Sequence, residues 1–198
     1  MSRSRSPVRR IVEGILIVMG LVCVAWVAAA AMRSSAHTRR TMALAETWPT
    51  PAVRSEASAI ETLERGAPVG VLAIPRLEFS QAIAEGDDDG TLGVSIGHLP
   101  DTPLPWHRGN SVVAAHRDTQ FRALEGIRIG DRLRLQTPHG EFSYVVRDLI
   151  ITSPDDLSVI KPTDTRSLTL ITCYPFRYVG HAPQRFIVVA SEVPTPAL

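Results

Sequence analysis

The most constraining feature of this chain is a run of 19 consecutive uncharged residues, Gly14–Met32. As an α-helix rising about 1.5 Å per residue, such a run nearly matches a bilayer hydrocarbon core of about 30 Å. Residues 1–10 before it hold four arginines and no acidic residue. We therefore expect a basic N-terminal tail over 1–10, a transmembrane anchor over 11–32 and a separate folded domain further along the chain.

A cleavable signal peptide is the second interpretation of this segment. Signal peptides have an apolar stretch of about 7–15 residues and small residues at the cleavage site, and Ala28–Ala30 offers such a site. Because the run is longer than that, we favour an uncleaved anchor. Three arginines in residues 33–40 nearly balance the four before the span, so the flanking charges only weakly indicate which end faces the cytoplasm.

Residues 33–66 are predicted to be a linker, since they are rich in Ala, Thr, Ser, Glu and Arg and are broken by Pro49 and Pro51. Ala52–Arg65 contains good helix formers and is a candidate polar helix. We favour a stalk between bilayer and domain, and the alternative is a segment that folds back over a functional site.

Residues 67–194 have the pattern of one mostly β domain, followed by a short tail at 195–198. The segments are short, apolar or alternating, and are separated by turn residues, which is typical of a barrel or sandwich. Short helices are expected at Asp89–Ile96 and Thr119–Leu124, and a hairpin turn at Thr137–Gly140. The expected strands are Val69–Ile74, Ser111–Ala115, Asp131–Gln136, Glu141–Ile151, Ser167–Thr172 and Arg185–Ala190.

Charge and cysteine content exclude several functions. The net charge is +1, and residues 67–198 carry more acidic than basic side chains, so the domain is not expected to bind nucleic acid. The two cysteines are too few for a disulfide scaffold or a Cys-rich zinc site. Cys23 lies in the apolar run and Cys173 in the domain, so Cys173 is expected to be a free, reactive thiol.

Three polar residues stand at predicted strand ends: His116, Cys173 and Arg185. A thiolate is a nucleophile that a nearby cation stabilises, a histidine can act as base and then as acid, and an arginine can stabilise charge developing on a carbonyl oxygen. Together they would form an acyl-transfer site. Six histidines are available, and spacing alone does not show that these three residues meet.

Several separated motifs resemble the sortases, the cysteine transpeptidases of bacterial surfaces. Thr169–Cys173 (TLITC) is similar to their TLxTC signature, and its extension to Val188 resembles the class D pattern. Val113–Thr119 (VAAHRDT) resembles an AGHRDT segment, with Ala115 in place of the usual Gly, and Gly97–Pro100 (GHLP) resembles a GHxP segment. Leu104–Trp106 departs from the family's LPG at its last position.

This resemblance implies an eight-stranded β-barrel in which Cys173 is the nucleophile, His116 the acid/base and Arg185 the oxyanion or substrate-positioning group. Thr172, the signature Thr, would contact the substrate carbonyl. No cofactor is implied. Asp87–Asp89 lacks a regular calcium-loop pattern and is expected to cap a helix. His98 and His181 are expected to be structural, whereas His107, His139 and Arg177 are expected to be solvated.

The expected function is that of a membrane-anchored cysteine transpeptidase. It would cleave a sorting signal near the C-terminus of exported proteins through a thioacyl enzyme, and join them to an amine acceptor such as peptidoglycan or a pilin subunit. Such substrates require a single-pass protein of the bacterial cytoplasmic membrane, with the N-terminus inside and the domain outside. The alternatives are a cysteine endopeptidase with water as acceptor and a non-catalytic sortase-like assembly module.

Overall fold

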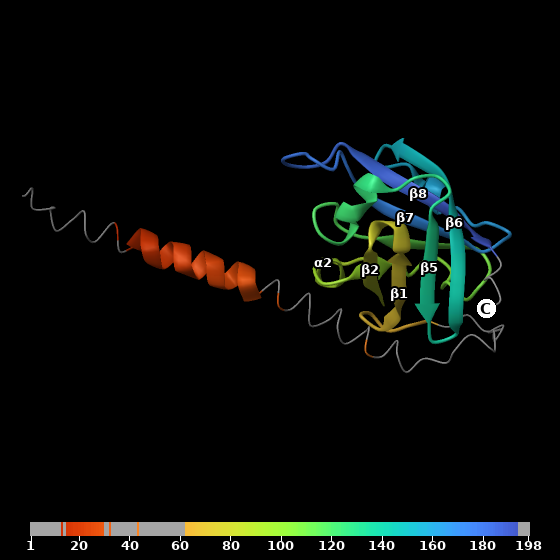
Figure 1. The fold of residues 1–198 in the computed structure, drawn as a ribbon, viewed down its shortest axis with the longest axis horizontal. Coiled ribbons are helices and arrows are strands. Elements are labelled where there is room, and N and C mark those ends of the chain that lie inside the picture. The colour runs from red at the N-terminus through yellow and green to blue at the C-terminus, as the bar shows by residue number, and fades with distance from the viewer. Residues whose placement is uncertain (1–12, 14, 30–31, 33–42, 44–61, 194–198) are drawn as a thin grey trace, which may run out of the picture. The chain divides into compact units, whose positions relative to one another are not determined.

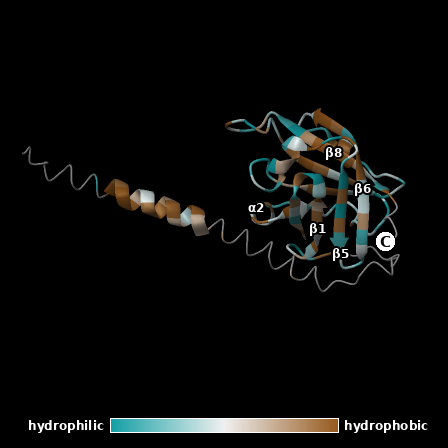
Figure 2. Cartoon of the chain, viewed as in Figure 1, coloured by the Kyte–Doolittle hydropathy of each residue, from teal (hydrophilic) through white to brown (hydrophobic). Residues whose placement is uncertain are grey.

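The computed structural model describes residues 13, 15–29, 32, 43 and 62–193. The chain divides into two compact units, Met1–Ala36 and His37–Leu198. In the first unit residues 15–29 are helical, and the ribbon of this helix is mostly brown, the colour of hydrophobic residues, in Figure 2. Its large apolar side chains are more than half exposed. Across the described residues, no helix has both the length and the apolarity needed to cross a bilayer.

Most of the predicted linker and both predicted tails lie outside the described residues. The question of a stalk or a folded-back segment therefore stays a prediction. At the end of the linker, residues 62–64 have no regular structure and 65–66 form a turn. This described part of the predicted polar helix at Ala52–Arg65 is not helical, because Arg65 enters a turn in which Ala67 N donates to Glu64 O at 2.9 Å.

Within residues 62–193, eight strands close into a barrel in the order β1-β2-β3-β4-β7-β8-β6-β5 (Figure 1). The β2–β3 and β4–β7 pairs are parallel and the other six are antiparallel. Short helices lie between the strands. The elements are β1 (Pro68–Ile74), η1 (Pro75–Leu77), β2 (Phe79–Glu85), α2 (Asp89–Leu92), β3 (Ile96–His98), β4 (Asn110–Ala114), η2 (Gln120–Gly126), β5 (Arg132–Thr137), β6 (Gly140–Thr152), η3 (Leu157–Ile160), β7 (Ser167–Tyr174) and β8 (Gln184–Val193).

The β5–β6 hairpin forms as the alternating pattern predicts. Along β5 the residues alternate between exposed and buried, because successive side chains of a strand point to opposite faces. The turn is closed by the Thr137 hydroxyl, which donates to Gly140 O at 2.9 Å. Gly140 has a φ of 121°, a backbone conformation that favours glycine. The closed barrel and all six predicted strands are confirmed, with ends that differ by at most three residues.

Two strands, β2 and β3, were not predicted from the sequence. β2 mixes Ser80 and Gln81 with apolar residues, and β3 has only three residues, so neither gives a clear apolar pattern. Residue 97 of β3 is a glycine because the backbone of Gly86 lies too close for a side chain, since a Cβ there would be 2.2 Å from Gly86 O. The predicted helix at Asp89–Ile96 is too long: it ends at Leu92, because Ile96 is fully buried and pairs with Ile83 of β2.

Candidate active site

Cys173 and Arg185 lie directly opposite each other on neighbouring strands. Cys173 is the penultimate residue of β7, Arg185 is the second residue of β8, and the two are register partners in the antiparallel ladder. Residues paired in this way have Cβ atoms about 4.5–5.5 Å apart on the same face of the sheet. The Cys173 thiol is free and half-buried. The pairing therefore puts a guanidinium group beside an accessible thiol.

His116 reaches the same end of the barrel from β4. The parallel β4–β7 pairs keep one register, which ends at Ala114 opposite Ile171. Beyond them, Ala115 N donates to Ile171 O at 3.2 Å. Continuing this register by two residues sets the exposed His116 level with Cys173. The barrel therefore brings together the three residues that the sequence analysis selected from three separate segments.

Thr172 holds the segment that carries His116. Its side chain is only 2% exposed, and its hydroxyl donates to Ala115 O at 2.7 Å. The signature threonine thereby ties β7 to the residue before the histidine. Its predicted contact with a substrate carbonyl stays a prediction.

The Arg185 guanidinium is held by backbone carbonyls. Its Nη1 donates to Gln184 O at 3.1 Å and to Ala182 O at 3.5 Å. Among residues 62–193, no carboxylate forms an ion pair with it. Its positive charge therefore remains available to an oxygen that becomes negative next to Cys173.

Three aromatic side chains support the strand ends from the inner side. The ring centroids of Tyr174 and Phe186 lie 6.2 Å apart, and Phe176 meets Phe186 at 5.2 Å in a T-shaped contact. Phe176 and Phe186 also pack against the barrel core. Since neighbouring side chains of a strand alternate between faces, this cluster indicates that Cys173 points to the outer face of β7.

The loop between β6 and β7, residues 153–166, is anchored beside this outer face. The Asn110 side-chain amide donates to Val159 O at 3.0 Å and to Lys161 O at 3.2 Å. Thr152, the β6 partner of Arg185, donates through its hydroxyl to Asp156 Oδ2 at 2.6 Å. These bonds hold the loop against Asn110 and against Thr152, the β6 residue that pairs with Arg185.

Hydrogen bonds also lower the pKa of the Asp156 carboxyl group, which anchors this loop. Ser158 and then Thr152 bind the ionised carboxylate and lower the pKa of Asp156 to about 2. Neither Asp156 nor the aromatic cluster was predicted from the sequence. Asp156 could have been found, because an Asp two residues before a Ser, as in Asp156 and Ser158, is typical of a helix N-cap.

The sortase domain family model matches residues 72–193 of this chain. The chain belongs to the sortase family. Sortase D of Bacillus subtilis (strain 168) is 40% identical over 131 residues, which cover 66% of each protein. The match thus spans slightly less than two thirds of that relative's length.

Solved sortase structures share the fold of this sortase. The Clostridium perfringens sortase D5 transpeptidase superimposes with a TM-score of 0.67 at 23% identity, covering 82% of this chain and 99% of that one. Clostridium perfringens sortase C with the C-terminal cell wall sorting motif gives a TM-score of 0.60 at 26% identity, covering 67% and 74%. The expected eight-stranded barrel and the family assignment are confirmed.

The remaining histidines of this sortase have mixed outcomes. His98 is buried, with Nδ1 2.8 Å from Glu85 Oε2, which supports a structural role, whereas His181 is exposed in the β7–β8 loop. The expectation that His107 and His139 are solvated is wrong. His139 stacks on Trp106 at 4.3 Å and His107 is half-buried with a buried Nε2, because the loop that carries Trp106 packs against the β5–β6 turn, at the barrel end opposite Cys173.

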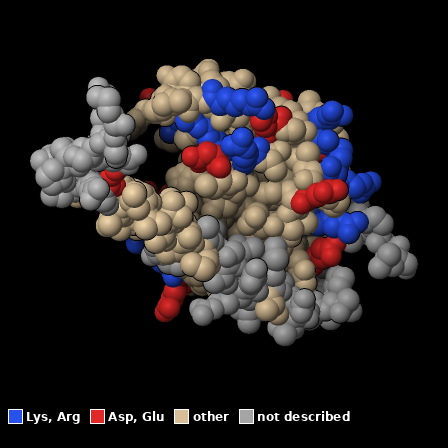
Figure 3. Space-filling model, turned by 60° about the vertical axis from the view of Figure 1, so that its left-hand side comes forward, with Lys and Arg blue, Asp and Glu red and all other residues tan. Residues whose placement is uncertain are grey.

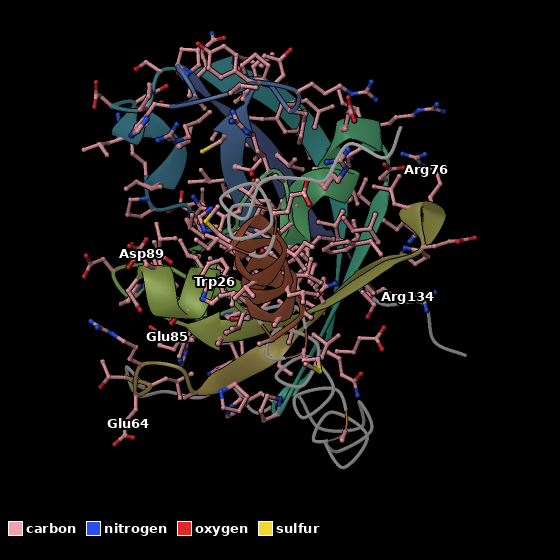
Figure 4. The ribbon with its side chains drawn as sticks, turned by 90° about the vertical axis from the view of Figure 1, so that its left-hand side faces the viewer. Trp26, Glu64, Arg76, Glu85, Asp89 and Arg134 are labelled. Atoms are coloured by element: carbon pink, nitrogen blue, oxygen red, sulfur yellow. The ribbon has the colours of Figure 1, made fainter. Side chains whose placement is uncertain are left out.

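Asp88 acts as a helix cap, as expected for the acidic triplet Asp87–Asp89. Its carboxylate accepts from Gly90 N at 3.0 Å and from Thr91 N at 3.3 Å, and the hydrogen bond from the Thr91 hydroxyl lowers its pKa. Figure 4 shows Asp89 on α2 near Glu85. In the part of the chain that the structure describes, no group of three or more His, Cys, Asp or Glu side chains could hold a metal ion.

Proposed function

We propose that this sortase is a cysteine transpeptidase that cleaves a sorting motif in exported proteins. The observation that carries the proposal is the cross-strand pairing of Cys173 with Arg185, with His116 level with them on β4. Further support comes from the solved sortase C structure that contains a C-terminal cell wall sorting motif. By analogy, the substrate of this chain is an extended peptide near the C-terminus of an exported protein.

In the first half of the reaction, the Cys173 thiolate attacks the carbonyl carbon of the scissile peptide bond. A C–S bond forms, and the C–N bond breaks as the protonated His116 gives its proton to the leaving amine. Arg185 donates hydrogen bonds to the carbonyl oxygen while that oxygen is negative. The product is a thioacyl enzyme and a free amine.

In the second half, an amine acceptor attacks the thioacyl carbon. Neutral His116 takes the proton of the incoming amine, a new C–N bond forms and the C–S bond breaks to return the thiolate. A peptidoglycan stem amine and a pilin lysine are both primary amines that suit this step. The face of the molecule in Figure 3 carries both acidic and basic side chains, so this face offers no uniformly basic surface to a polyanion.

The experiment is a peptide-library reaction with the full chain in detergent, with and without an added amine, followed by mass spectrometry. Transpeptidation predicts a product that gains the amine, whereas an endopeptidase releases only the hydrolysed acid. Cys173→Ala is expected to abolish both products, and Cys23→Ala to leave turnover unchanged. A wild-type chain that cleaves no peptide would instead support the non-catalytic assembly module.

We also propose that residues 11–32 anchor the enzyme in the bacterial cytoplasmic membrane, with the catalytic domain outside. The support is the 19-residue uncharged run and the exposure of the apolar side chains on the helix at 15–29. A reporter fused after Leu198 is expected to be active outside the cytoplasm, on a mature protein that keeps residues 1–32. A cytoplasmic reporter, or an N-terminus that begins near Ala31, would contradict the anchor.

A further inference from the structure

Arg117 crosses from the segment after β4 to the β7–β8 loop, residues 175–183. Its Nη1 donates to Pro175 O at 3.0 Å, and its Nη2 donates to Tyr178 O at 2.9 Å and Gly180 O at 3.2 Å. The guanidinium carbon also lies 5.7 Å from the centre of the Tyr178 ring. One side chain thus binds three backbone carbonyls that span six residues of the loop.

The loop depends on such a partner because its tip has little packing of its own. Val179 is 98% exposed and Tyr178 is 48% exposed, and the β7–β8 connection, drawn blue, projects beyond the barrel in Figure 1. The Arg177 side chain is 82% exposed and meets Glu125 at 3.2 Å. An exposed ion pair of this kind contributes little to stability, so Arg117 provides the main polar anchor.

The far end of the same loop holds the catalytic arginine. Ala182 O and Gln184 O accept from Arg185 Nη1, and Cys173 lies two residues before the first carbonyl that Arg117 binds. A movement of the loop therefore moves Ala182 O, one of the two acceptors that orient the Arg185 guanidinium relative to the thiol.

We propose that Arg117 is a positioning residue that acts through the β7–β8 loop to hold Arg185 over the acyl carbon bound to Cys173. This inference rests on the proposed transpeptidase function. Arg117 follows His116 directly, so one short segment supplies the acid/base and fixes the loop between the nucleophile and Arg185. Hydrogen bonds from Arg117 thereby join the segment that carries His116 to the loop between Cys173 and Arg185.

The planar arrangement of N–H donors in the guanidinium group, rather than its charge, lets Arg117 hold the β7–β8 loop. Arginine has five N–H donors in a fixed plane and can bind several carbonyls at once. A lysine ammonium is a compact point charge on a flexible stem and cannot reproduce that geometry. Arg117→Lys keeps the charge beside His116 but loses the simultaneous contacts, and so separates positioning from electrostatics.

The test compares Arg117→Ala and Arg117→Lys with the wild-type full chain in the peptide and amine reaction. Both variants are expected to lose kcat about ten-fold or more, since small displacements of reacting groups cost at least that, while a small alkylating reagent still modifies Cys173 at the wild-type rate. The matched control is Arg134→Ala. Arg134 is exposed on β5, is labelled in Figure 4, and is expected to stay within about two-fold.

Limited trypsin digestion tests the loop without relying on catalysis. Release of the loop is expected to speed cleavage after Arg177 several-fold in both Arg117 variants, with no change in Arg134→Ala or at sites in the barrel. Wild-type kcat in Arg117→Lys, or unchanged cleavage after Arg177, would overturn the positioning role. If the wild-type chain cleaves no peptide, the proposed function fails, and the digestion still decides whether Arg117 holds the loop.

Discussion

Cys173 of β7 and Arg185 of β8 are direct cross-strand partners, and their ladder continues without a break through Ser167 and Ser191. The backbones that carry the nucleophile and the charge-stabilising group keep their separation, because moving either strand requires breaking strand pairing. Arg185 also pairs with Thr152 of β6. The geometry of the site is therefore a property of the barrel and not of a loop alone.

Arg185→Lys is expected to lower turnover about 10²- to 10³-fold, the usual cost of losing one oxyanion donor. Lysine keeps the charge but cannot present two parallel hydrogen bonds. Steady-state kinetics with a cleaved peptide measures the loss, and alkylation of Cys173 by a small reagent is expected to remain normal.

The control for this variant is Arg177→Ala, which removes an exposed loop arginine. Its ion pair with Glu125 is solvated, so we expect turnover close to that of the wild type. Near-normal turnover in Arg185→Lys together with a large loss in Arg177→Ala would show that the loop arginine is the charged partner of the nucleophile.

Thr172→Val is expected to damage both stability and turnover. The change leaves Ala115 O without the donor it has at 2.7 Å, and an unsatisfied buried acceptor costs about 1–3 kcal/mol of unfolding free energy. Because His116 follows Ala115, we also expect turnover to fall about ten-fold or more. Denaturant unfolding and peptide kinetics measure the two effects.

The matched variant is Thr172→Ser, which keeps the hydroxyl and loses only a methyl group. Turnover should return toward the wild-type value in this variant. If Thr172→Ser is as slow as Thr172→Val, then the methyl group, and not the bond to Ala115 O, is what the site needs.

The strands that carry the active site were predictable because each is a short apolar run with a polar residue at its end. SLTLIT before Cys173 and SVVAA before His116 both have this form. Their convergence was not predictable from spacing, since the parallel β4–β7 register joins residues 57 positions apart. The resemblance to sortases supplied that long-range information.

Polar contacts across the barrel were the part that the sequence could not indicate. Arg117 binds carbonyls 58 to 63 residues away, and backbone carbonyls carry no sequence signal. β3 was missed because its burial is set by its neighbours: His98 is 1% exposed only because Glu85 and the loop after β3 enclose it.

His98→Ala is expected to destabilise the fold by about 1–3 kcal/mol, the usual cost of leaving a buried hydrogen-bonding group without its partner. His98 Nε2 lies 3.2 Å from Pro103 O, and Nδ1 lies 2.8 Å from Glu85 Oε2. Without the ring, the 5% exposed Glu85 loses its partner.

Guanidinium unfolding of His98→Ala, Glu85→Gln and the double variant measures this coupling. The double variant is expected to be more stable than the sum of the two single losses predicts, because no carboxylate is then left buried. Additive losses would mean that the two side chains contribute independently.

The low pKa of Asp156 predicts that the β6–β7 loop keeps its anchor in acid. The folded-state pKa of about 2 lies below the ordinary 3.8. The ionised, hydrogen-bonded Asp156 therefore stabilises the folded state fully above pH 3.8, and this stabilisation is lost as the pH falls through 2. Thr152→Val removes the hydroxyl that donates to Asp156 Oδ2 at 2.6 Å and is expected to raise this pKa. Carboxyl-carbon NMR titration measures it, and Asp88, whose pKa depends on Thr91, should titrate identically in both proteins. An Asp156 curve that does not move in Thr152→Val would show that Ser158 alone sets the pKa and that Thr152 does not anchor the loop.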